Sequence, residues 1–262
     1  MLHGEFGLVS IIMAAYNAEK TIELAIESVL NQTYSNFELL VINDCSKDGT
    51  AKLVEDFSAK DNRVRLISNE KNSGVSFTRK HGLEEANGSW IAILDSDDAW
   101  APEKLEKQIE LQNRTNADLL FTGSAFMDSE GRPIDWYLHA PAEATYRQLL
   151  KQNVLSNSSA LVRKELYAKH YAVGDGMHED FAIWLSILKD GKKAYGVDEP
   201  LLIYQIAKSS KSGNKIKAAK MNWNTYRYVG LNVVEAAYYE AWYMFKNVMK
   251  YANLKFSGEG TE

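Results

Sequence analysis

The chain has 262 residues, with 45% hydrophobic and 25% charged residues. This composition excludes disorder, collagen-like repeats and long coiled coils. The single cysteine, Cys45, cannot form an internal disulfide, and no apolar run reaches the roughly 20 residues that span a bilayer. The apolar stretch Leu8–Ala15 has no Lys or Arg before it and therefore does not read as a signal peptide. We expect a cytoplasmic protein.

Charge is distributed unevenly along the chain. The formal net charge is −5, yet residues 205–256 hold nine Lys and Arg residues against two Glu residues, a net of +7. The remainder therefore carries a net charge of −12. The acidic body argues against a nucleic-acid partner, and the basic end predicts a second role for that part of the chain.

Strand-like and helix-like segments alternate in the first half. Short apolar runs predict buried strands at Leu8–Ala14, Phe37–Ile42, Val64–Ile67 and Trp90–Leu94. Apolar residues at helical spacing predict helices at Asn17–Asn31, Thr50–Ala59 and Val75–Ala86. Gly88 reads as the C-cap of the third helix, and Pro102 as the start of a fourth. The order predicts an α/β fold, with a mainly parallel sheet between helices and ligands beyond the carboxyl ends of its strands.

The second half is less regular. Strands are predicted at Leu119–Thr122, Ala160–Val162 and Pro200–Tyr204, and helices at Glu179–Leu188, Lys215–Tyr228 and Val234–Tyr251. We therefore expect a main domain at residues 1–204 and a basic, aromatic helical extension at residues 205–262.

Acidic residues follow the fourth predicted strand. Asp95, Asp97 and Asp98 place three carboxylates in four residues, and their mutual repulsion is relieved by a divalent cation. Hard oxygen ligands select Mg²⁺ or Mn²⁺, whose coordination shell substrate phosphates often complete. The alternative is a polar turn in which Asp97 or Asp98 caps the next helix.

Other polar residues follow the first two strands and a later helix start. Asp44 ends the second strand, and Ala14 and Tyr16 at the end of the first would admit a ligand and offer a ring to a base. Simple packing is the alternative for Tyr16. Glu179 and Asp180 open a helix, a position that the helix dipole alone explains.

Two long segments carry a resemblance to a known family. The segments VSIIMAAYNAEKTIELAIESVLNQTYSNFELLVINDCSKDGT and NSGVSFTRKHGLEEANGSWIAILDSDDAWAPEKL resemble the donor-binding half of family 2 glycosyltransferases. The resemblance covers about residues 8–204 and is greatest to enzymes of teichuronic-acid or lipopolysaccharide-type surface glycan assembly. It implies a GT-A fold with a donor half at about 8–117, a base half at about 118–204, and a UDP-sugar donor with Mn²⁺ or Mg²⁺.

The resemblance also implies residue roles. Ala14, Tyr16 and Asp44 would surround the uracil, and Arg79 would meet the nucleotide or its phosphates. In the acidic cluster, Asp97 would bind the metal, Asp95 the sugar or ribose, and Asp98 the donor sugar.

The resemblance assigns the acidic pair to catalysis. Asp180 would be the base, and Glu179 would orient the acceptor. Inverting transfer needs one such carboxylate, because the metal stabilises the leaving diphosphate.

Three functions follow as hypotheses. The favoured one is inverting transfer of a hexose or N-acetylhexosamine from a UDP-sugar to a glycan, predicted to be lipid-linked. A sugar-phosphate nucleotidyltransferase is disfavoured, because the first loop, AAYNAEK, lacks a glycine-rich basic phosphate site. The remaining alternative is a non-catalytic nucleotide-sugar-binding or scaffold member of a glycan-assembly complex.

The C-terminal extension combines lysines with aromatic residues. Trp242 and Phe245 flank Lys246 and Lys250, a pattern typical of helices that lie on anionic membranes. We therefore expect peripheral association with the inner face of the cell membrane. The alternative is that these helices pack on the catalytic domain or on a second subunit.

Overall fold

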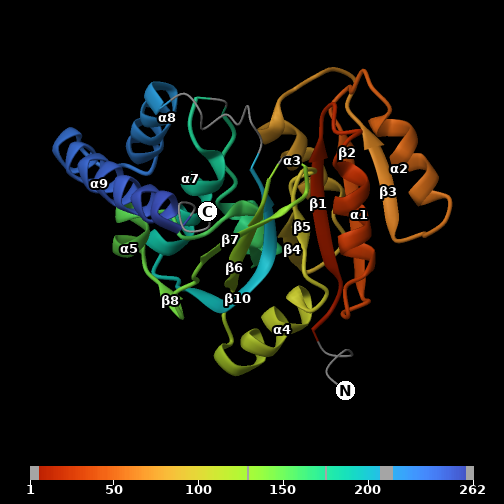
Figure 1. The fold of residues 1–262 in the computed structure, drawn as a ribbon, viewed down its shortest axis with the longest axis horizontal. Coiled ribbons are helices and arrows are strands. Elements are labelled where there is room, and N and C mark those ends of the chain that lie inside the picture. Colours follow the sequence, from red (N-terminus) through yellow and green to blue (C-terminus); the bar gives the residue numbers. More distant parts are fainter. Residues whose placement is uncertain (1–5, 129, 175, 207–214, 258–262) are drawn as a thin grey trace.

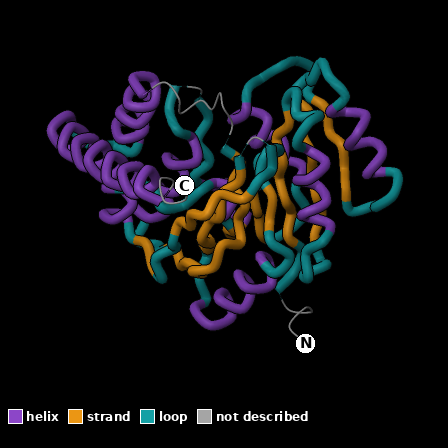
Figure 2. Tube along the Cα trace, in the orientation of Figure 1, coloured by secondary structure: helices purple, strands orange, loops and turns teal. Residues whose placement is uncertain are grey.

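A ten-stranded mixed sheet runs through the centre of the molecule, with helices around it (Figures 1 and 2). The computed structural model describes residues 6–128, 130–174, 176–206 and 215–257, with the backbone alone for 215–216 and 247–257. The strands are β1 (Val9–Ala15), β2 (Phe37–Asn43), β3 (Val64–Ser68), β4 (Trp90–Ile93), β5 (Ala99–Trp100), β6 (Leu119–Met127), β7 (Pro133–Leu138), β8 (Glu143–Ala144), β9 (Leu161–Arg163) and β10 (Ala194–Gln205). Their order is β3-β2-β1-β4-β9-β6-β10-β5, with β7 beside β6 and β8 beside β10.

The first half forms the predicted β–α repeats. Helices α1 (Ile22–Leu30), α2 (Thr50–Ser58) and α3 (Val75–Glu85) connect β1, β2, β3 and β4, and all pairings among these four strands are parallel. Every residue of β2 is buried, as the apolar run Leu39–Ile42 within it indicates. The predicted helix after Pro102 is α4 (Lys104–Thr115).

The expectation that Gly88 caps α3 is wrong. The helix ends at Glu85, and its cap residue Ala86 is extended. A Cβ atom at Gly88 would lie 2.5 Å from the Leu8 carbonyl oxygen. Glycine is therefore required because the chain passes so close to β1, where the Gly88 amide donates to Ser10 Oγ at 2.8 Å.

The second half interrupts the parallel order. Strand β9 is antiparallel to both β4 and β6, whereas β6 and β10 are parallel to each other. Because β9 runs opposite to β4 and β6 runs opposite to β9, β6 and β10 run in the same direction as β4. The carboxyl ends of β6 and β10 therefore lie at the same sheet edge as those of β1, β2 and β4. Residues from both halves can therefore meet at one edge.

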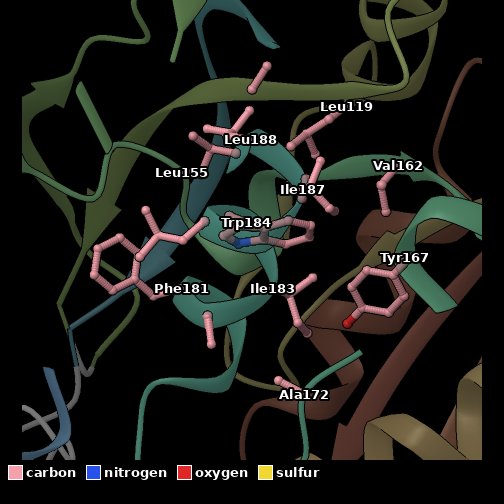
Figure 3. Close-up of a cluster of buried hydrophobic side chains, with 14 of the residues drawn as sticks. Leu119, Leu155, Val162, Tyr167, Ala172, Phe181, Ile183, Trp184, Ile187 and Leu188 are labelled. Carbon is pink, nitrogen blue, oxygen red and sulfur yellow. The ribbon is translucent and has the colours of Figure 1, made fainter. Parts of the chain in front are cut away.

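Two hydrophobic clusters pack against the sheet. One includes residues of α1, α2 and α4, and the other includes residues of α3, α5 (Tyr146–Lys151) and α7 (Glu179–Lys189). Figure 3 shows Trp184 of α7 within the second cluster, where its side chain is fully buried. The Tyr167 ring of α6 (Lys164–Lys169) lies 5.7 Å from it between centroids. This packing fixes α7 against the sheet.

The C-terminal helices pack on the same cluster. Helix α8 (Lys215–Tyr228) buries Tyr226, whose hydroxyl donates to the Leu150 carbonyl at 2.7 Å, and α9 (Val233–Ser257) buries Ala236. Both lie at the opposite end of the molecule from α2 and β3 (Figure 1). Packing on the main domain is thus confirmed for one face of these helices. In the described part of the chain, no helix has the length and apolar character needed to cross a membrane.

Candidate active site

Asp44, at the end of β2, is held by the start of α3. Its Oδ1 accepts from Asn69 Nδ2 at 2.7 Å and from the Ser73 amide at 2.8 Å, and its Oδ2 accepts from the Gly74 amide at 2.9 Å. Gly74, the N-cap, has φ of 82°, a conformation that favours glycine. Burial raises the pKa of Asp44, but these hydrogen bonds outweigh it and lower the pKa overall. The carboxylate is ionised and fixed in place.

The ends of β1 and β2 lie side by side. The Asp44 amide donates to the Ala15 carbonyl at 2.8 Å, next to a half-buried Ala14. Tyr16 follows with 51% of its surface exposed. The structure thus brings together the three residues predicted to surround a uracil, and that role stays a prediction.

Arg79, on α3, joins two acidic sites that are far apart in sequence. Its Nη2 donates to Asp95 Oδ1 at 2.5 Å, and its Nη1 donates to Glu179 Oε1. The side chain is 8% exposed. Burial lowers the pKa of Arg79, but the two carboxylates raise it further, so the guanidinium stays charged. The predicted contact between Arg79 and the nucleotide is untested, and both of its Nη atoms are engaged by protein carboxylates.

Asp98 fixes the acidic loop to the base half. Its Oδ2 accepts from Ser158 Oγ at 2.6 Å, in the short helix η1 (Asn157–Ser159), and its Oδ1 accepts from the Gln205 amide at 3.1 Å. Burial, followed by the charges of Asp95 and Asp97, raises the pKa of Asp98 well above its usual value. The predicted donor-sugar contact of Asp98 is untested, and in the structure its oxygens bind groups of the fold.

Asp97 is the exposed carboxylate of the loop. The surrounding protein limits its solvation, and this, with the adjacent Asp95 charge, raises its pKa. A hard divalent cation suits such a group, because it would relieve the repulsion. Within the described residues, no three or more His, Cys, Asp and Glu side chains form a group that could hold a metal. Mg²⁺ or Mn²⁺ bound at Asp97 would therefore take further ligands from diphosphate and water.

The predicted base opens α7. Glu179 and the half-buried Asp180 are its first two residues, and the adjoining His178 amide donates to Thr225 Oγ1 of α8 at 3.0 Å. Burial and the neighbouring Asp180 raise the pKa of Glu179, while Arg79 opposes that rise. The catalytic role of the pair stays a prediction, and the geometry places it beside the acidic loop.

Several residues of the site escaped the sequence reasoning. Asn69, Ser73 and Gly74 hold Asp44, and the Asn72-Ser73-Gly74 turn before α3 was a usable signal for Ser73 and Gly74. Ser158 had no such signal, because its role depends on β9 pairing beside β4. The Trp100 indole donates to the Ser158 carbonyl at 2.7 Å and is buried, so it packs within the fold.

Comparison with known proteins identifies the family. Residues 10–170 match the model described as glycosyl transferase family 2. The chain belongs to this family. It is 38% identical over 220 residues to the putative teichuronic acid biosynthesis glycosyltransferase TuaG of Bacillus subtilis, covering 84% of this chain and 87% of that protein. It is 36% identical over 246 residues to the UDP-Glc:alpha-D-GlcNAc-diphosphoundecaprenol beta-1,3-glucosyltransferase WfgD of Escherichia coli, covering 94% and 95%.

Solved structures share the fold of this family 2 glycosyltransferase. Residues 1–349 of S. aureus TarS, in complex with UDP-GlcNAc, align with a TM-score of 0.70 at 20% identity, over 90% of this chain and 71% of that one. The mannosyltransferase PcManGT of Pyrobaculum calidifontis, in complex with GDP-Man and Mn²⁺, aligns with a TM-score of 0.66 at 16% identity, over 84% and 63%. The predicted GT-A fold is confirmed.

Proposed function

We propose that this glycosyltransferase moves a hexose or N-acetylhexosamine from a UDP-sugar to a lipid-linked glycan during surface polysaccharide assembly, with inversion and with Mn²⁺ or Mg²⁺. The name of TuaG supports the polysaccharide role. The name of WfgD supports the UDP-sugar, the lipid-linked acceptor and the inversion, because an inverting displacement from an α-linked donor gives a β linkage.

One observation carries the proposal. Arg79 contacts both Asp95 of the acidic loop and Glu179 at the start of α7. The acidic loop, which we assign to the metal and diphosphate, is therefore linked through one side chain to the start of α7, which we assign to the base. Inverting transfer needs these two groups on either side of one anomeric carbon, because the hydroxyl attacks from the face opposite to the leaving diphosphate.

The chain's residues have distinct roles in this proposal. Asp44 accepts a hydrogen bond from the uracil, and Tyr16 offers its ring to the base. Asp180 takes the proton of the acceptor hydroxyl while that oxygen bonds to the anomeric carbon. The bond between this carbon and the β-phosphate oxygen breaks, and UDP leaves. A cation held at Asp97 neutralises charge on the diphosphate when bound.

A donor screen tests the proposal. Purified protein with Mn²⁺ is incubated with individual UDP-sugars, with and without an undecaprenyl-diphosphate-linked sugar, and UDP release is measured. We expect one donor to be turned over far faster than the others, and chelation of the metal to abolish the reaction. Metal-dependent UDP binding without turnover of any donor would instead favour the non-catalytic reading.

A membrane surface is the proposed location of the reaction. Helix α9 exposes seven apolar side chains between residues 233 and 245: Val233, Val234, Ala237, Tyr238, Ala241, Met244 and Phe245. Glu235 is exposed in the first turn of the same helix. Lys246 is exposed beyond these apolar side chains, as are Lys217, Lys220 and Arg227 on α8. Apolar area together with nearby cations suits an anionic lipid surface. Lys208 and Lys211 lie outside the described residues, as does the side chain of Lys250.

A further inference from the structure

Helix α3 connects the donor half to the base half at several points. Its N-terminus is held by Asp44 through the Ser73 and Gly74 amides. Two residues after Gly74, the Ser76 carbonyl accepts from Tyr171 Oη at 2.6 Å, and Ser76 Oγ accepts from the Gly174 amide at 3.2 Å. Residues 171–174 precede α7 in the chain. The N-terminal turn of the helix therefore contacts both the proposed nucleobase site and the segment that precedes the proposed base.

Arg79 lies on this helix with little freedom to move. Its side chain is 8% exposed, and its two Nη atoms contact Asp95 and Glu179. A turn of Arg79 toward a diphosphate would break two charge-assisted hydrogen bonds. It would also leave Glu179, whose side chain is 12% exposed, as an unpaired buried charge. The geometry thus disfavours the nucleotide contact that the sequence resemblance implied.

We propose that Arg79 is a positioning residue that fixes the acidic loop, through Asp95, relative to the base helix, through Glu179, and does not bind the nucleotide. Asp180 adjoins Glu179, so the distance from the proposed base to the donor's anomeric carbon depends on this clamp. The inference rests on the proposed function for the identity of the reaction. The clamp itself rests only on the contacts of Arg79.

Arg79→Lys tests the clamp. Lysine keeps the charge, but its single ammonium cannot reproduce the planar fork that holds two carboxylates. We expect kcat to fall about 100-fold, the loss typical when reacting groups are misplaced by about 1 Å. The KM for the UDP-sugar and the Kd for UDP should stay at wild-type values. A rise in the Kd for UDP parallel to the loss of kcat would overturn the proposal, because it would make Arg79 a donor ligand.

Glu179→Gln tests the same contact while keeping Arg79 unchanged. It weakens one arm of the clamp, so kcat should fall again without a change in UDP affinity. In the double variant with Arg79→Lys, the decrease in kcat should be less than the product of the two single-variant effects. Both changes break the same contact between Arg79 and the start of α7. Full additivity would contradict the clamp.

Lys80→Gln is the matched control. Lys80 is the neighbouring residue on α3, is 49% exposed, and pairs only with Glu84 at 3.5 Å among the described residues. It should leave kcat and UDP affinity unchanged, and an equal loss in this variant would overturn the specific role of Arg79.

The proposal can be judged even if no UDP-sugar is transferred. In that case the proposed function fails, while amide hydrogen exchange at residues 178–182 still reports on the clamp. Faster exchange there in Arg79→Lys, with unfolding temperature retained, would support the inference. Unchanged exchange would overturn it.

Discussion

The donor half and the base half build their parts of the site in different ways. In the donor half, Asp44 and Asp95 lie within two residues of the ends of parallel strands, so strand direction alone brings them to one edge. In the base half, Glu179 and Asp180 open a helix whose position depends on the buried face of α7 and on Arg79. The donor half thus places its groups through local connectivity, and the base half through long-range packing. Variants in each half can test these two kinds of placement separately.

The largest expected effect comes from Asp180→Asn. Removal of the proposed base should lower kcat by about 10²–10⁴-fold. Affinity for UDP with Mn²⁺ should persist, because the donor half is intact, and calorimetric titration checks this. Asp97→Asn should instead weaken metal-dependent UDP binding. If Asp180→Asn kept full activity, the base assignment would fall.

Trp184→Ala should be the most destabilising change in the base half. It deletes a fully buried indole, and such deletions cost about 3–5 kcal/mol in the free energy of unfolding. Because α7 carries the proposed base, the remaining folded protein should lose kcat more than UDP affinity. Urea unfolding and kinetics measure the two effects. Trp184→Phe fills much of the space that alanine leaves empty, so it should lower both stability and kcat less than Trp184→Ala. Equal losses from these two variants would contradict the packing argument.

Asp44→Asn should weaken the donor half. An amide nitrogen would face one of the donors that the carboxylate now accepts from, at a cost of about 1–3 kcal/mol in the free energy of unfolding. The folded-state pKa of Asp44 is lowered, so its contribution is full above the unfolded pKa of about 3.9 and is lost as pH falls through the folded value. Thermal unfolding should therefore show a wild-type advantage at pH 7 that shrinks in acid. If the stability difference between wild type and Asp44→Asn instead increased in acid, the ionised state of Asp44 would be contradicted.

The smallest effect on stability is expected on the exposed face of α9. Tyr238→Ser with Phe245→Ser removes exposed rings and should change the free energy of unfolding by about 0.5 kcal/mol or less per site. Binding to vesicles that contain anionic lipid, measured by co-sedimentation, should nevertheless drop. Wild-type binding by this variant would exclude the face as the lipid contact, and a shift from dimer to monomer in sedimentation would assign it to a second subunit.

The sequence predicted the donor half well because its signals are local. Each strand of β1 to β4 is a short apolar run, and each helix between them has its own apolar spacing. It missed β5 and β8, which are two residues long, and β7, which carries no clear alternation. The insertion of β9 between β4 and β6 also has no local signal, because it pairs residues about 70 apart in sequence. That insertion brings Ser158 within hydrogen-bond distance of the Asp95 amide and the Asp98 carboxylate.

By itself, the sequence determined the α/β class, the parallel β–α repeats and which carboxylates end strands or open a helix. These properties depend on side-chain periodicity and on chain direction, which short stretches of sequence determine. Only the tertiary structure decided that Arg79 contacts Asp95 and Glu179, that Asp98 is engaged by Ser158 and Gln205, and that one face of α9 packs while the other is exposed. These outcomes depend on contacts between segments far apart in the chain, and no residue spacing encodes them.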